Sequence, residues 1–336
     1  MNELLKITNE YRDAVGYASK VARSGLSKMP PLIITCAITG GLHGAELNPN
    51  LPETKDAQVQ SAYDAYNAGA SIVHIHARDP KNLAAMSNDV NDFKEINARI
   101  REKCPDLIIN NTCLGGRLIA ETDKGMVITP NLLSSLDALP ELSSIDLTCG
   151  STYMPVKARK APLTGRDQDG LLKMNYFLTM GEAPMVATEM TKRGIKPELE
   201  VYSEYDVLQY VLPMAQKGLF GDDPLWVQML FGGNGTFPNV ESMVNATRIL
   251  PKNSLFSVIG VGAAQNAMIT LAMIMGHHVR VGMEDNLVYG PGELAKSNAQ
   301  LVERVVRIAK ELGRPIATPA QAREMLGLGA PRPYTF

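Results

Sequence analysis

The chain has 336 residues, of which 45% are hydrophobic, so it is long enough for a large core and matches the usual size of an α/β barrel. A net charge of −2, without a lysine or arginine block, argues against nucleic acid as a partner. We find no membrane-length apolar stretch, no secretory signal and no CxxC spacing among the four cysteines, so we expect a cytoplasmic protein with no membrane partner.

The first predicted element is an amphipathic helix within residues 1–30, which forms an extension ahead of the first strand. Eight apolar segments follow as predicted strands: Leu32–Ala37, Ser71–His76, Leu107–Asn111, Ser143–Leu147, Glu198–Tyr202, Leu225–Leu230, Leu255–Ile259 and His278–Gly282. Helix patterns follow each of them: Lys55–Asn67, Val90–Lys103, Leu132–Ala138, Met174–Lys192, Tyr205–Gln216, Val240–Ile249, Ala264–Met275 and Leu294–Leu312. This alternation predicts an α/β fold, a (β/α)8 TIM barrel, over residues 31–328.

The segments outside this alternation complete the prediction. The polar stretch Gly150–Gly170 is interpreted as a lid or an oligomer arm, because long loops in compact domains usually have a function. A C-terminal helix is expected at Pro319–Leu326 after the N-cap Thr318, with residues 329–336 as a tail. An open doubly wound sheet is the structural alternative, although no glycine-rich dinucleotide fingerprint follows the first predicted strand.

Two histidines one residue apart, His74 and His76, close the second predicted strand. Residues i and i+2 of a strand share a face, so both imidazoles should point the same way. Imidazole is a ligand for zinc, copper, iron and nickel. The pair therefore predicts half of a metal site, with two hydrogen-bonded strand-end histidines as the alternative.

Two adjacent carboxylates, Glu284 and Asp285, follow the last predicted strand. Functional groups of a barrel gather at the C-terminal ends of its strands, and strands two and eight are two positions apart in the ring. Glu284 should therefore face His74 and His76, which together would form a typical catalytic zinc ligand set. Asp285 would then be free as a base, tuned by Arg280; the alternative is that the two acids cap the final helix.

Other polar residues are weaker candidates. His43 in the first loop could contact substrate or simply be a solvated loop residue. His277 and His278 lie at the start of the last strand and are interpreted as structural. Asn111, at the end of the third strand, is a candidate donor to a developing enolate oxygen.

Several segments of the chain resemble the β-keto acid cleavage enzymes. They include Asn50-Leu51-Pro52, Ala68-Gly69-Ala70 ahead of the histidine pair, Glu198–Tyr202 and, most specifically, Val279–Asn286. The resemblance covers residues 31–328.

The resemblance implies a zinc-dependent barrel, or one using another divalent metal, that converts a β-keto acid and acetyl-CoA into acetoacetate and a new acyl-CoA by retro-Claisen cleavage. It implies that the metal ligands are His74, His76 and Glu284, that Arg280 and Asp285 form the catalytic couple, and that substrate contacts fall on Ser144, Thr112 and Cys113. In one respect the chain departs from the family: a member acting on an amino-substituted keto acid has an acidic residue where Leu42 stands here.

Three other functions stay open at this point: a class II aldolase-like enzyme, a metal-dependent hydrolase barrel, and a catalytically silent metal-binding protein. Hydrolases with His-x-His on a barrel strand need further histidines from the middle strands, and none lies between His76 and His277. The N-terminal helix and the 17 methionines suggest a homo-oligomer, and the resemblance implies a tetramer.

Overall fold

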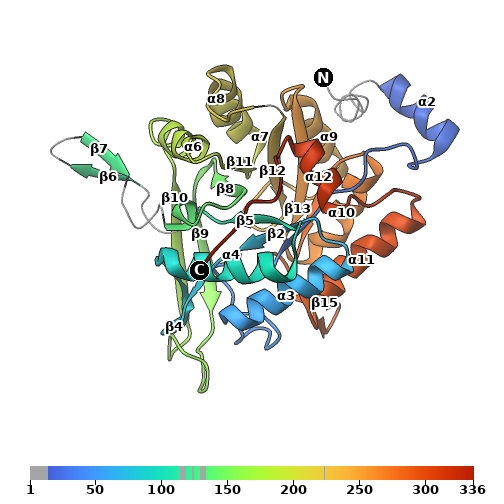
Figure 1. Cartoon of the computed structure of the whole chain (residues 1–336). Helices are drawn as coiled ribbons and strands as arrows, with labels where there is room; N and C mark the ends of the chain where they lie inside the picture. Colours follow the sequence, from blue (N-terminus) through green and yellow to red (C-terminus); the bar gives the residue numbers. More distant parts are fainter. Residues whose placement is uncertain (1–13, 114–118, 123–124, 129–133, 223) are drawn as a thin grey trace.

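Eight parallel strands close into a barrel, so the predicted (β/α)8 fold is confirmed (Figure 1). The structure is a computed structural model that describes residues 14–113, 119–122, 125–128, 134–222 and 224–336. Around the ring the strands follow the order β1 (Ile34–Ala37), β14 (His278–Val281), β13 (Ser254–Gly260), β12 (Leu225–Phe231), β11 (Lys196–Val201), β8 (Leu142–Asp146), β5 (Ile108–Asn111) and β2 (Ile72–Ile75). The strand β1 alone separates β2 from β14, as the metal-site prediction requires.

Helices between the strands form the outer layer (Figure 1). They are α3 (Lys55–Ala68), α4 (Val90–Lys103), α5 (Ser134–Asp137), α6 (Ala183–Lys192), α9 (Val240–Ile249), α10 (Gln265–Ile274) and α11 (Asn298–Glu311). Local signals determine their ends: α3 begins at Thr54, whose side chain accepts a hydrogen bond from the Ala57 amide, and ends at Gly69 in the left-handed region (φ 116°). In the N-terminal extension, the described part is a helix, α2 (Ala14–Ser24).

The helix predicted at Tyr205–Gln216 is interrupted. The segment consists of α7 (Glu204–Asp206), a π-helical stretch (Val207–Val211) and α8 (Leu212–Gln216). Pro213 has no N–H for the α-helical bond to Gln209, and it lies in the first turn of α8, where that bond is not needed, directly after the π-helical stretch.

The long stretch after β8 differs from the prediction. Residues expected as a loop and as the start of a helix from Met174 instead form an antiparallel hairpin, β9 (Cys149–Val156) and β10 (Gly170–Phe177), beside β4 in Figure 1. The paired residues of these strands are at least fourteen positions apart in the chain. The nearest pair is Val156 with Gly170, and the separation grows from there toward Cys149 with Phe177. Local periodicity cannot detect such a pairing, so α6 begins only at Ala183.

Further short pairs surround the mouth. They are β3 (Arg78–Asp79) with β4 (Asn82–Met86), β6 (Ile119–Thr122) with β7 (Gly125–Ile128), and β15 (Val288–Gly290) with β16 (Glu293–Leu294). Because Leu294 belongs to β16 and Ser297 caps the next helix, α11 starts four residues later than predicted. Of the predicted helix Leu132–Ala138, the first two residues lie outside the described part.

The barrel interior has an apolar floor. The inward residues at the strand starts pack against the C-terminal helix α12 (Pro319–Leu326): Ile33, Ile72, Ile108, Leu142, Trp226 and Leu255 on the strands meet Ala322, Met325 and Leu326. The helix α12 therefore closes the N-terminal end of the barrel. Among the described helices, none has the length and hydropathy needed to cross a bilayer.

Candidate active site

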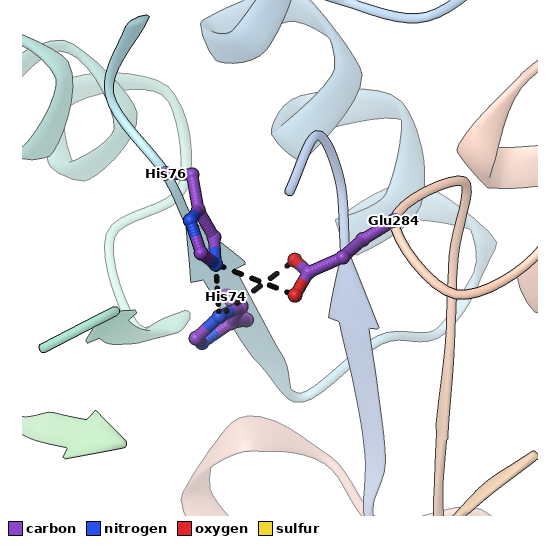
Figure 2. A group of neighbouring side chains, drawn as sticks. All are labelled: His74, His76 and Glu284. Carbon is purple, nitrogen blue, oxygen red and sulfur yellow. Dashed lines mark hydrogen bonds and ion pairs between the residues drawn. The ribbon is translucent and has the colours of Figure 1, made fainter. Parts of the chain in front are cut away.

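Three side chains predicted as metal ligands meet at the C-terminal end of the barrel (Figure 2). His74 lies on β2 and His76 directly follows it, and their Nε2 atoms are 3.1 Å apart. Glu284, in the turn after β14, places Oε2 3.7 Å from His74 Nε2 and Oε1 3.3 Å from His76 Nε2. Figure 2 shows the two imidazole rings and the Glu284 carboxylate converging on one point, the rings from the end of β2 and the carboxylate from the turn after β14.

The donor set fits a divalent metal ion. Ligand bonds of about 2.0–2.1 Å in a tetrahedral site separate the donor atoms by about 3.3 Å, close to the spacings observed here. Burial lowers the pKa of His74 to about 3, so its imidazole is neutral, as a ligand must be. The Nδ1 atom of His76 lies 3.2 Å from Met86 Sδ, which leaves Nε2 toward the other donors. Oε2 of Glu284 is buried and accepts no hydrogen bond within the described chain.

Two glycines allow the Glu284 side chain to lie beside the imidazoles of His74 and His76. A Cβ on Gly40, which has φ +66°, would lie 2.6 Å from Glu284 Cγ. A Cβ on Gly282 would lie 2.0 Å from the carbonyl oxygen of Ala37. The turn after β14 can therefore press against the end of β1, where the Glu284 amide donates to the Ala37 carbonyl at 3.2 Å.

Arg280 is the centre of the charged network beside these ligands. Its guanidinium donates to Glu200 Oε1 at 2.7 Å, to Glu284 Oε1 at 2.6 Å and to both oxygens of Asp285 at 3.0 Å. Burial opposes the charge of Arg280, but the three carboxylates outweigh it and hold its pKa well above the usual range. Asp285 is thus held by Arg280 in a bidentate ion pair, and these two residues are the couple expected from the sequence.

The two adjacent acids differ in protonation. For Asp285, burial outweighs the attraction of Arg280 and raises the pKa to about 7. For Glu284, burial is offset by Arg280 and the two imidazoles, and the pKa is held well below its usual range. A carboxylate with a pKa near neutrality suits a general base, while one that stays ionised suits a ligand.

Glu198 and Glu200 on β11 are further buried acids of the barrel interior, and the sequence interpretation did not name them as site residues. Glu198 accepts hydrogen bonds from Asn110 at 2.7 Å and from Trp226 and Gln228 at 2.6 Å. Burial raises the pKa of Glu198 to about 7. Glu198 and Glu200 alternate with apolar residues as His74 and His76 do, and that alternation was the available signal.

Asp146, at the end of β8, is the other interior acid that was missed. It pairs in register with Glu200, two residues above Ser144. Both of its carboxylate oxygens are buried, and its polar side-chain partner is the Glu200 carboxyl group. Burial, together with Glu200, raises the pKa of Asp146 well above its usual range.

The structure brings only some of the predicted substrate contacts inward. Ser144 shares the inward face of β8 with Leu142, and Thr112 continues the inward face of Asn110. The Asn111 amide instead donates to the Ser135 carbonyl of α5, outside the ring, at 3.2 Å. Cys113 lies in the outer hydrophobic core, where burial raises its pKa to about 12.

The remaining histidines are not part of this group of three donors. His43 is half-buried in the loop after β1, where its carbonyl accepts from Arg78 at 2.6 Å and burial lowers the pKa of its ring. His277 bonds Thr247 at 2.8 Å, and His278 Nδ1 accepts from the Ile33 amide at 3.1 Å. The last two contacts agree with the structural role predicted for these two histidines.

The fold and the site define a (β/α)8 enzyme with a metal-type ligand set at its catalytic face. The chain belongs to the β-keto acid cleavage enzyme family, whose profile matches residues 31–328. It is 36% identical over 301 residues to the 3-keto-5-aminohexanoate cleavage enzyme of Acetoanaerobium sticklandii, covering 89% of this chain and 99% of that relative. It is 32% identical over 302 residues to the 3-oxoadipate:acetyl-CoA acetyltransferase of Cupriavidus necator, covering 89% of this chain and 95% of that relative.

Solved structures show the same barrel. The apo form of ObcA matches with a TM-score of 0.63 at 18% identity, over 84% of this chain and 66% of that one. At this identity the likeness concerns the fold alone.

Proposed function

We propose that this protein is a zinc-dependent β-keto acid cleavage enzyme that uses acetyl-CoA and releases acetoacetate and a new acyl-CoA. The observation that carries the proposal is the convergence of His74, His76 and Glu284 beside the Arg280–Asp285 ion pair. Relatives named for acetyl-CoA-dependent transfer support the cosubstrate. The donor set of two imidazoles and one carboxylate supports zinc.

The proposed reaction exchanges acyl groups. Its atoms balance when C2 of the β-keto acid becomes the carbon nucleophile and bonds the acetyl carbonyl carbon. CoA then moves to the ketone carbon C3 and the C2–C3 bond breaks. A divalent ion at the three ligands would act as a Lewis acid on the substrate ketone.

The protein residues handle the proton and the charge. Asp285 takes a proton from C2 and later returns it, because its pKa of about 7 lets it exist in both states near neutrality. Arg280 orients that carboxylate through two hydrogen bonds of 3.0 Å. Ser144 and Thr112 are retained as proposed substrate contacts, whereas the outward placement of Asn111 and Cys113 removes the argument for theirs.

The decisive experiment mixes metal-loaded protein with a panel of β-keto acids, with and without acetyl-CoA, and follows acetoacetate and acyl-CoA. We expect equal amounts of both products, formed only when acetyl-CoA is present, and loss of activity after chelation that zinc restores. Cleavage without acetyl-CoA would instead indicate an aldolase or hydrolase. Full turnover after complete metal removal would refute the zinc assignment.

The assembly and the location stay predictions. We expect a homo-oligomer, as a tetramer, which light scattering of the purified protein would measure directly. The cytoplasmic location rests on the sequence argument.

A further inference from the structure

The two imidazoles of the ligand set differ in what contacts their second ring nitrogen, Nδ1. Nδ1 of His76 lies 3.2 Å from Met86 Sδ, and a thioether is a weak hydrogen-bond acceptor. Nδ1 of His74 is buried beside an amide, because His74 on β2 pairs in register with Asn110 on β5. A neutral imidazole carries its proton on one nitrogen, so the contact at Nδ1 determines whether Nε2 offers the lone pair that a metal ion needs.

The side chains of Asn110 and His74 are complementary. Burial lowers the pKa of His74, and a hydrogen bond with the Asn110 side chain acts in the opposite direction. A partner raises the pKa of an imidazole when it accepts a hydrogen bond from the ring, so the amide oxygen of Asn110 is the atom that faces His74. Oδ1 of Asn110 and Nδ1 of His74 are both buried, and neither has another polar partner in the described chain. Each atom is therefore the remaining partner for the other.

Glu198 determines which way the Asn110 amide points. The amide nitrogen of Asn110 donates to Oε1 of Glu198 at 2.7 Å. Oε2 of the same carboxylate accepts from Trp226 Nε1 and from Gln228 Nε2, both at 2.6 Å, so two side chains of β12 hold it in place. A carboxylate accepts hydrogen bonds and repels an amide oxygen, so the nitrogen of Asn110 stays on Glu198 and the oxygen is left for His74. All of these side chains are fully buried, where bulk water does not compete for the bonds.

We propose that Asn110 is a positioning residue, which with Glu198 as its anchor holds the proton of His74 on Nδ1 and so keeps Nε2 free for the metal ion. The inference rests on the proposed metal site. It adds that His74 is the better oriented of the two imidazoles, because its acceptor is an amide oxygen and that of His76 is a thioether. Orienting contacts of this kind contribute about 10- to 100-fold to metal affinity.

The test measures zinc affinity by competition with a chromophoric chelator at about pH 8, where Glu198 is ionised. Asn110→Leu keeps the branched shape of the side chain and removes its polar atoms, so zinc binding should weaken by about 10- to 100-fold. Asn111→Leu is the matched control. Asn111 is as deeply buried on the same strand, but its amide bonds the Ser135 carbonyl of α5, so the zinc affinity should stay near the wild-type value.

The tautomer of His74 gives a second readout that needs neither zinc nor turnover. The chain has five histidines, so in metal-free protein with isotope-labelled histidine the ring nitrogens of His74 can be assigned by comparison with His74→Ala. We expect the proton on Nδ1 in the wild-type protein and in Asn111→Leu, and a shift of population toward Nε2 in Asn110→Leu. The wild-type spectrum tests the inference even if Asn110→Leu fails to fold.

Two results would overturn the inference: a His74 proton on Nε2 in the wild-type protein, or equal zinc affinity in Asn110→Leu and Asn111→Leu. Failure of the proposed function is distinct from both. The wild-type protein would then bind no zinc or release no acetoacetate, whichever ring nitrogen of His74 carries the proton.

Discussion

Replacing Gly40 by alanine should weaken metal binding without removing a ligand. The new Cβ would lie 2.6 Å from Glu284 Cγ and 3.2 Å from its Cβ and Cδ. Carbon atoms in contact prefer about 3.5–4.0 Å, so the Glu284 side chain must retreat by about 1 Å. A displacement of this size misplaces one of three ligands, and we expect a loss of about 10- to 100-fold in metal affinity, comparable to the loss of an orienting contact.

The backbone effect of this substitution has a matched control. Gly40 has φ +66°, so alanine there also costs about 1–2 kcal/mol of folding free energy. Gly313 has φ +71° and nothing within 4 Å of an added Cβ, so Gly313→Ala carries the same strain without the clash. Zinc affinity from competition with a chromophoric chelator, together with urea unfolding, separates the two effects. Equal zinc affinity in the two variants would refute the role given to Gly40.

Three other outcomes follow from the site. His74→Ala should lose bound metal and activity together, measured by metal analysis and acetoacetate release; an active, metal-free variant would contradict the ligand assignment. Asp285→Asn should keep its metal and lose about 10²–10⁴-fold in turnover, whereas unchanged turnover would exclude it as the base. Folding raises the pKa of Glu198 from 4.5 to about 7. Between these two pH values the folded metal-free protein therefore keeps a proton on Glu198 that the unfolded chain has lost. The free energy of unfolding should fall by about 3 kcal/mol as pH rises from below 4.5 to above 7. Urea unfolding at pH 4.5 and 7.5 should show a shallower fall in Glu198→Gln, and an equal fall would disprove this origin.

The convergence of His74, His76 and Glu284 could be predicted from sequence because each step is local or topological. A strand period of two places His74 and His76 on one face, and a closed parallel ring places the turn after β14 near them. The strands themselves are short apolar runs with helices between them, which local patterns detect well.

The sequence could not predict which side chains pair with each other across the barrel interior. Arg280 was expected to tune Asp285, but its bonds to Glu200 join elements whose relative height in the barrel depends on register. The Cys149–Phe177 hairpin has the same origin, because its strands are defined by each other and not by their own periodicity. Asn111 was placed at the site by its position at a strand end, whereas the alternation of β5 turns it toward α5.

The packing of α12 under the strands determines from which side molecules reach the site. Ala322, Met325 and Leu326 close the N-terminal end of the barrel, so access is left to the opposite end, where His74, His76 and Glu284 meet. The reactants and products of the proposed reaction would all pass through that end.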